Sequence, residues 1–278
     1  MILSTHITPG LFQSDQDFDN LSDMGHCAGL SELEEEAKAV LRAQGKTEEE
    51  ADYAVHYSIH AGCCSDKEVV RKWLDSGNLV KMIAEREAKI LAPLTGSLLE
   101  QCEHLFSDPC YMYVMLGACA MTHGCQLPAS FLVMLKKVYT EGGLKPDAQR
   151  QMHKALFGPN GFKNGVPYDF ESKSLLEVAN SEPGEPDNGL GYRGLNVPDP
   201  LLFSPVRTNC STSLVVKELR SQALKPDECG GCGVDHRPKG KNLLTCSKCM
   251  KRMYCSTACQ KKHWKIHKKV CEPAEVSL

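Results

Sequence analysis

The chain has 278 residues, of which 42% are hydrophobic, and its formal net charge at pH 7 is -3. This length and apolar content are sufficient for a buried core, so they exclude a chain that is disordered throughout. The first residues carry neither the basic nor the apolar segment of a secretory signal, and no apolar run approaches the ~18 residues that a membrane helix needs. We therefore expect a soluble protein of the cytoplasm or nucleus.

Capping signals and the spacing of prolines predict an all-helical domain over residues 31–180, after an irregular lead-in over residues 1–30. Strand-like alternation is almost absent from this part of the chain, which argues against a catalytic sheet of the Rossmann or SET type. The predicted helices cover residues 31–43, 47–61, 65–74, 78–91, 95–106, 109–123, 129–141 and 146–157.

Serine and threonine residues mark the starts of the first three predicted helices. Ser31 and Ser65 are candidate N-caps, because their side chains can accept hydrogen bonds from the free amides of a first turn. Thr47 and Glu50 form a capping box, in which each side chain bonds the backbone of the other residue.

Two further features concern the organisation of the chain. Residues 56–77 have a spacing reminiscent of ankyrin repeats, and residues 118–142 echo it loosely, so a helical-repeat-like arrangement is left open. Residues 181–210 are rich in Pro and Gly, which predicts a flexible linker. A connecting helix over residues 211–224 is then expected to lead into a small C-terminal unit, residues 225–271.

Charge is distributed unevenly between these parts. Residues 1–224 carry 20 Lys and Arg against 30 Asp and Glu, whereas residues 225–271 carry 12 against 3. The C-terminal unit is therefore basic.

The same unit contains eight potential metal ligands in a regular order. Cysteine pairs separated by two residues point both sulfurs at one ion, and a structural zinc site is closed by four Cys or His ligands. Eight ligands therefore predict two zinc ions. The ligands are Cys229, Cys232, Cys246, Cys249, Cys255, Cys259, His267 and Cys271.

The remaining cysteines are scattered through the predicted helical sequence. The chain has 15 cysteines, and those outside the zinc sites are expected to be reduced and packed in the core. This use of cysteine agrees with an intracellular compartment.

The C-terminal unit resembles a MYND-type zinc finger. The resemblance rests on the Cys229-Gly-Gly-Cys232 turn, on the spacing of the later cysteines, and on the closing His267xxxCys271. Spacing alone permits two consecutive sites, but the resemblance implies interleaved ones. One ion would then be held by Cys229, Cys232, Cys255 and Cys259, and the other by Cys246, Cys249, His267 and Cys271. His263, one turn before His267, is the competing imidazole.

A zinc ion with four protein ligands has no position for water or substrate, so we expect the finger to bind partners and to catalyse nothing. The resemblance implies an adaptor role in protein–protein interaction, with Ser247, Gln260 and Trp264 lining a groove for proline-containing peptides. The alternative for Trp264 is packing against the zinc core. Direct nucleic-acid binding by the lysines of residues 261–269 is a weaker alternative, because no base-reading helix is evident.

An enzyme remains the second hypothesis. Some MYND proteins are methyltransferases with a SET domain, but no matching motif is found upstream, so an activity would have to belong to an unrecognised helical site. His56 and His60, near Cys63 and Cys64, are a candidate third site, although core histidines are commoner. Residues 198–202 resemble a MYND ligand and are a candidate for binding the groove in cis.

Overall fold

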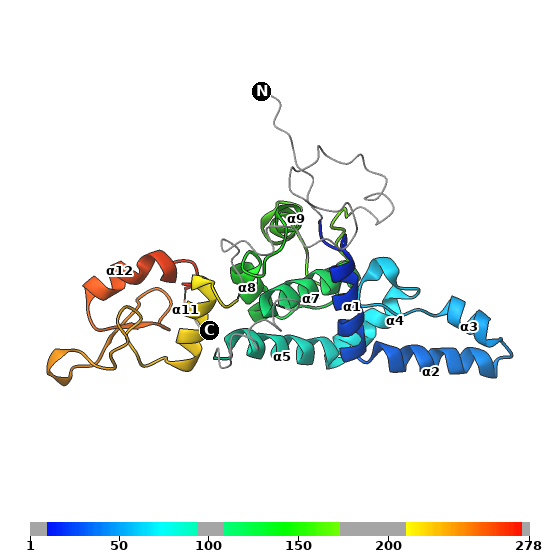
Figure 1. Ribbon diagram of the computed structural model, residues 1–278, viewed down its shortest axis with the longest axis horizontal. Helices are drawn as coiled ribbons and strands as arrows, with labels where there is room; N and C mark the ends of the chain where they lie inside the picture. Colours follow the sequence, from blue (N-terminus) through cyan, green and yellow to red (C-terminus); the bar gives the residue numbers. More distant parts are fainter. Residues whose placement is uncertain (1–9, 94–107, 173–209, 274–278) are drawn as a thin grey trace, which may run out of the picture.

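The protein is mainly helical, as Figure 1 shows in a computed structural model that describes residues 10–93, 108–172 and 210–273. The expected mainly α fold with a small C-terminal finger is confirmed. In chain order the helices are α1 (Asp15–Cys27), α2 (Leu30–Ala43), α3 (Glu48–Ala54), α4 (Lys67–Trp73), α5 (Leu79–Leu91), α7 (Pro109–His123), α8 (Ala129–Val138), α9 (Pro146–Phe157), α11 (Leu214–Leu224) and α12 (Thr257–His267). Strands β1 (Leu244–Thr245) and β2 (Met253–Tyr254) form an antiparallel hairpin in the finger.

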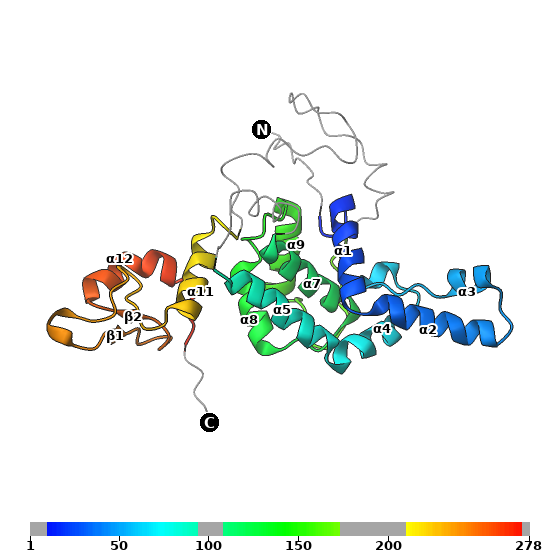
Figure 2. The ribbon, with the colours of Figure 1, turned by 60° about the horizontal axis from the view of Figure 1, so that its bottom comes forward.

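Helix α7 lies at the centre of the helical part and contacts α1, α4, α5 and α8 (Figures 1 and 2). It begins at Pro109, which fits a first helical turn because its missing amide would have no partner there. Its C-cap is Gly124, whose φ of 69° favours glycine. The side chains of α7 are buried on all faces of the helix, so its sequence has no amphipathic pattern. This central position differs from the linear stacking of a repeat array.

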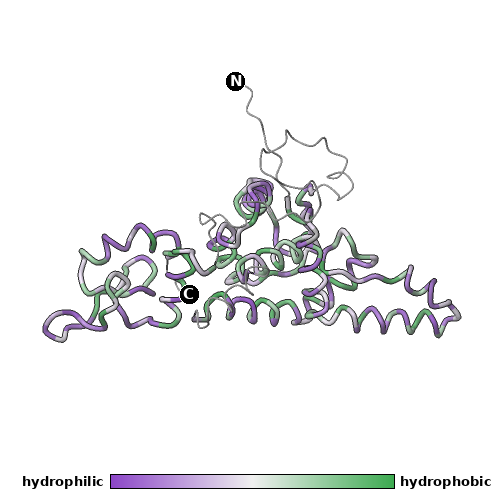
Figure 3. The backbone as a smooth tube through the Cα atoms, viewed as in Figure 1, coloured by the Kyte–Doolittle hydropathy of each residue, from purple (hydrophilic) through white to green (hydrophobic). Residues whose placement is uncertain are grey.

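The helices around α7 each bury one face against the core. Figure 3 shows hydrophobic and hydrophilic residues alternating along α5, and its buried residues are Leu79, Met82, Ile83 and Ile90. The α2–α3 hairpin instead projects from the core at the end opposite the finger (Figure 1). Tyr53 on α3 is 95% exposed there.

The expected irregular lead-in is wrong, because residues 15–27 form α1. Ser14 caps this helix by accepting a hydrogen bond from the Asp17 amide. Leu21 and Met24 are spaced by three residues and point into the core, where both are buried. Their helical spacing was obscured by the acidic residues around them, Asp15, Asp17, Asp19 and Asp23.

Two of the three predicted caps are wrong. The Thr47–Glu50 capping box is confirmed. Helix α4 is capped by Asp66 and not by Ser65, whose hydroxyl instead pairs with the backbone of His56. Helix α2 begins after Gly29, which has no side-chain cap, so Ser31 lies inside the helix.

Helix α3 ends at Ala54, well before the predicted end at residue 61. The chain then runs extended, because side chains accept the hydrogen bonds of backbone amides that a longer helix would have satisfied. The Tyr57 amide donates to Glu34 Oε2 at 2.7 Å, and the His56 amide donates to Ser65 Oγ at 3.0 Å.

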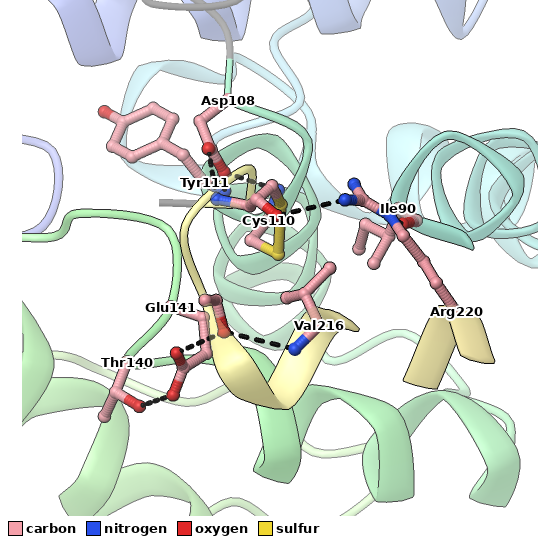
Figure 4. The surroundings of a disulfide bond; sticks show 10 residues. Ile90, Asp108, Cys110, Tyr111, Thr140, Glu141, Val216 and Arg220 are labelled. Atoms are coloured by element: carbon pink, nitrogen blue, oxygen red, sulfur yellow. Dashed lines mark hydrogen bonds between the residues drawn. A yellow bond between two sulfur atoms is a disulfide. The ribbon is translucent and has the colours of Figure 1, made fainter. Parts of the chain in front are cut away.

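Helix α11 joins the helical part to the finger, as expected for the connecting helix. Ser213 caps it and also donates to Glu141 Oε2 at 2.7 Å. Val215, Val216 and Leu219 are buried in the main core. On the same side, Arg220 Nε donates to the Ile90 carbonyl at 2.7 Å (Figure 4). The helix is thereby fixed to α5.

Cys110 and Cys210 form a disulfide bond between the first turn of α7 and the segment before α11 (Figure 4). The expectation that every cysteine outside the finger is reduced is therefore wrong for this pair. Asp108, the N-cap of α7, also accepts a hydrogen bond from the Cys210 amide at 2.8 Å. The disulfide and this hydrogen bond together hold the segment before α11 against the first turn of α7.

The finger is packed directly on the helical part. Val270 belongs to the main hydrophobic core, and Lys137 Nζ on α8 lies 3.3 Å from Glu272 Oε2. Figure 2 shows α11 between the finger and the helices α5 and α8. The predicted helix over residues 95–106, residues 181–209 of the predicted linker and, within it, residues 198–202 lie outside the described residues. No described helix is long and apolar enough to cross a membrane.

Candidate metal centre

The first group of predicted ligands comes together in a cluster that is buried at only one of its four positions. Its ligand atoms all lie within 4.8 Å of one another. The Sγ atom of Cys255 lies 3.5 Å from those of both Cys232 and Cys259. Cys255 follows β2, and Cys259 lies in the first turn of α12, where its amide donates to the N-cap Ser256. The cluster consists of Cys229, Cys232, Cys255 and Cys259.

The second group lies closer to α11 and is buried at all four positions. Cys246 Sγ lies 3.8 Å from Cys271 Sγ, and Cys249 Sγ lies 3.5 Å from His267 Nε2. Cys246 directly follows β1, and His267 ends α12. The cluster consists of Cys246, Cys249, His267 and Cys271.

Both clusters fit a tetrahedral zinc ion. A Zn–S bond of about 2.3 Å places the sulfurs of a tetrahedron about 3.8 Å apart, close to the separations found here. Backbone amides also favour the thiolate at one ligand of each cluster. Burial opposes ionisation of Cys229, but hydrogen bonds from backbone amides outweigh it and lower the pKa of this thiol to about 6. The pKa of Cys246 is lowered to about 6, because backbone hydrogen bonds and His267 likewise outweigh burial.

The ligand order along the chain is interleaved, with two ligands of one cluster followed by two of the other, twice. Beside the ligands, the buried core of this unit contains Tyr254. The turn between Cys229 and Cys232 requires glycine, since a Cβ atom on Gly231 would come 2.9 Å from that of Cys259. Metal ligation would therefore cross-link a segment too small to be held by its own apolar core.

His263, the competing imidazole, does not join either cluster. Its Nε2 atom lies 3.2 Å from Glu218 Oε2, and its Nδ1 atom lies 3.3 Å from the Tyr254 hydroxyl. His267 Nε2 faces the second cluster instead.

Glu218 on α11 lies beside the second cluster, and no sequence pattern singles it out. It is only 3% exposed and contacts His267 and His263 of the finger. Burial raises the pKa of this carboxyl, but hydrogen bonds from His267 and Gln222 outweigh burial and leave the pKa lowered. A single Glu within an amphipathic helix gives no sequence signal, because most such residues face solvent.

The expected peptide-binding residues lie on two segments. Gln260 and Trp264 are four residues apart on α12 and so share one face of the helix. Ser247 is exposed in the turn between Cys246 and Cys249. Trp264 is 40% exposed, and its ring centroid lies 5.9 Å from that of His267. The Trp264 indole therefore lies against His267, a candidate metal ligand, and exposes part of its own surface to solvent.

The candidate third site does not form a cluster of three ligands among the described residues. His56 Nδ1 lies 3.5 Å from Glu34 Oε2, whereas the His60 ring stacks on Phe12 with centroids 4.1 Å apart. His60 is thus a half-buried histidine that stacks on Phe12 and lies 3.6 Å from Cys63 Sγ through Nδ1, and His56 belongs to a surface ion-pair group.

Residues 222–271 match the family model of the MYND finger. The C-terminal region of the chain is thus a MYND finger, as the sequence resemblance implied, and the match is confined to this region. A finger of this family implies zinc, and the two clusters are able to bind it.

Tudor domain-containing protein 1 is similar to about half of this chain. The mouse protein is 38% identical over 137 residues, which are 49% of this chain and 10% of the relative. The human protein is 31% identical over 139 residues, 46% of this chain and 11% of the relative. A SET and MYND domain-containing protein of Dictyostelium discoideum is 44% identical over 57 residues, 20% of this chain and 10% of the relative.

The chain thus spans about a tenth of the length of these relatives. The similarity to the mouse protein covers more residues than the finger match, so it includes residues outside the finger. No solved structure matches the chain.

Proposed function

We propose that this chain is a protein-interaction adaptor whose MYND finger holds two structural zinc ions and docks proline-containing segments of partner proteins. The observation that carries this proposal is the position of Trp264. It lies on α12, the helix that also carries Cys259 and His267, and 40% of it is exposed. Ligation of the two ions would fix the helix and so the indole.

The zinc ions would be structural. Each cluster supplies four ligands, which complete a tetrahedron and leave no position for water or substrate. The role of the metal would be to order the finger, because its ligands come from four separate stretches of a short segment.

A proline-containing peptide suits the surface around Trp264. Such a peptide is already extended in solution, so it loses little conformational entropy when it binds, and its rings pack on an exposed indole. Gln260, one turn before Trp264, offers an amide that can bond the peptide backbone. Ser247 is the third proposed contact, through its exposed hydroxyl.

The chain itself would have no catalytic residues in this account, and it would act in the cytoplasm or nucleus. A shallow groove beside α11 is lined by cationic and apolar residues and one serine, with no carboxylate, imidazole or thiol among them. The groove residues are Pro93, Lys217, Arg220, Ser221, Leu224 and Lys225. The SET and MYND relative keeps an enzyme as the alternative, although the similarity covers only 20% of this chain.

The proposal is tested with the zinc-loaded full chain on an array of proline-containing peptides. We expect binding that Trp264→Ala reduces at least ~10-fold, since stacking on an aromatic anchor contributes on the order of 1–2 kcal/mol or more. Tyr53→Ala removes an aromatic residue that is 95% exposed on α3, far from the finger, and serves as the matched control. Zinc content is measured in all variants.

Equal binding by the wild-type chain and by Trp264→Ala, with both zinc ions present, would contradict the proposed docking site. Binding that persists in Trp264→Ala, and that falls steeply with salt for nucleic acid as well as for peptide, would point to the lysines of α12 instead.

A further inference from the structure

Glu218 lies on α11, four residues before the start of the family match at residue 222. Its side chain nevertheless points into the finger and is buried between α11 and α12. A buried carboxylate is costly unless charged or hydrogen-bonding groups surround it. Its partners therefore indicate what the position does.

The two carboxylate oxygens have different partners in the finger. Oε1 lies 3.2 Å from His267 Nδ1 and accepts a hydrogen bond from Gln222 Nε2 at 2.8 Å. Oε2 lies 3.2 Å from His263 Nε2. Arg252 Nε lies 3.4 Å from Oε1, within ion-pair distance, although it forms no hydrogen bond.

The contact with His267 has a chemical consequence. His267 presents Nε2 to the second cluster, 3.5 Å from Cys249 Sγ. An imidazole that binds a metal through Nε2 needs a free lone pair there, so its proton must be on Nδ1. A carboxylate at Nδ1 accepts that proton in a hydrogen bond and fixes both the tautomer and the ring orientation.

Gln222 supports the same assignment. Its Nε2 atom lies 3.5 Å from His267 Nδ1 but only 2.8 Å from Glu218 Oε1. An amide nitrogen and a protonated Nδ1 are both donors and cannot accept from each other. Both therefore donate to the acceptor between them, Glu218 Oε1.

We propose that Glu218 is a positioning residue of the second metal centre, and that this centre therefore begins on α11, upstream of the residues that match the family model. Glu218 holds His267 in the tautomer and orientation that bind zinc through Nε2. The inference rests on the proposed zinc function of the finger.

Arg252 balances the charge of this arrangement. It is only 3% exposed, and its Nη2 atom donates to Ser221 Oγ on α11 at 2.7 Å. A metal with three thiolates and one imidazole leaves a net charge of about -1, to which Glu218 adds another negative charge. The guanidinium lies beside the Glu218 carboxylate and lowers the cost of burying it.

The test measures release of zinc from the full chain to a chromogenic chelator, and it compares Glu218→Leu and Glu218→Gln with the wild-type chain. We expect two zinc ions per wild-type chain. Glu218→Leu should release one ion 10- to 100-fold faster, as is typical when a second-sphere partner of a metal-binding histidine is removed. Glu218→Gln should have a smaller effect, because its amide oxygen still accepts the Nδ1 proton.

Glu228→Gln is the matched control, since it removes a carboxylate beside the first cluster that pairs with Lys225. It should leave both release rates unchanged. Helix content and the denaturation midpoint of the helical part are measured in parallel. A role in packing alone would release both ions faster together with a loss of helical stability.

Two results would overturn the proposal. In a wild-type chain that holds two zinc ions, unchanged release from Glu218→Leu would refute the positioning role and leave the proposed function intact. A wild-type chain without bound zinc would refute the proposed function and this role together.

Discussion

Three histidines among the described residues show how differently this side chain can be placed. His267 faces a cluster of thiols, His263 pairs with the buried carboxylate of Glu218, and His60 stacks on Phe12 in the helical part. Only the first is placed to bind metal. The identity of the residue therefore says less about its role than the charge and burial of its neighbours.

His60 should make the stability of the helical part sensitive to acid. Burial lowers its pKa to about 4, and the neighbouring His123 and Lys67 act in the same direction. The unfolded chain thus binds this proton more tightly than the folded chain. The stabilisation is complete above about pH 6.5, the usual value, and is lost as the pH falls towards 4.

Replacing His60→Gln removes that titration, so its melting temperature should fall less between pH 7 and pH 5 than that of the wild-type chain. Circular dichroism measures the melting temperature, and His56→Gln, which removes an exposed imidazole from the same segment, is the control. Loss of zinc at low pH affects all three proteins alike. Equal falls in the wild-type chain and in His60→Gln would contradict the account.

At the scale of elements, α11 is the helix that connects the helical core to the finger. One side of the helix carries apolar residues and Arg220 into the helical core, and the other side carries Glu218 into the finger. Arg220 Nη1 also donates to the Cys210 carbonyl at 3.1 Å (Figure 4). The guanidinium therefore satisfies two buried carbonyls at the ends of different segments.

Arg220→Leu should lower the free energy of unfolding by about 2–4 kcal/mol, because two buried carbonyls lose their charged donor. Guanidinium denaturation followed by circular dichroism measures the change. Lys217→Leu, on the exposed side of the same helix, should change stability by less than about 0.5 kcal/mol. Similar stabilities for the two variants would mean that Arg220 does not hold α11 in place.

Sequence reasoning was most successful where a signal is local. The capping box of α3 and the proline at the start of α7 depend on residues close in sequence, and both were found. The interleaved order of the candidate ligands was instead implied by the family resemblance. The end of α3 depends on Glu34, which is 23 residues from Tyr57, and the start of α4 on a choice between adjacent caps. Those choices depend on tertiary partners, so they were predicted wrongly.

The same division applies to the site. Ligand residues could be selected because cysteine pairs carry their spacing in the sequence. Glu218 and Arg252 could not be selected, since a glutamate and an arginine acquire their role only when α11 and the finger meet. The disulfide between Cys110 and Cys210 joins residues 100 positions apart, which no local pattern indicates.

At the scale of the whole molecule, the finger and the helical part share contacts. The connecting helix, the buried Val270 and the Lys137–Glu272 ion pair all cross the boundary between them. A binding surface on α12 would therefore be held at a fixed place beside the helical core, and would not sample space like a module on a free tether. The α2–α3 hairpin lies at the other end of the molecule (Figure 2).

The measurement that tests the central claim most directly is native mass spectrometry of the full chain, which counts bound zinc ions. We predict two ions in the wild-type chain and one in each of Cys255→Ser and Cys246→Ser, because each substitution removes a ligand from a different cluster. No zinc in the wild-type chain, or the loss of both ions from each variant, would contradict two separate closed zinc sites.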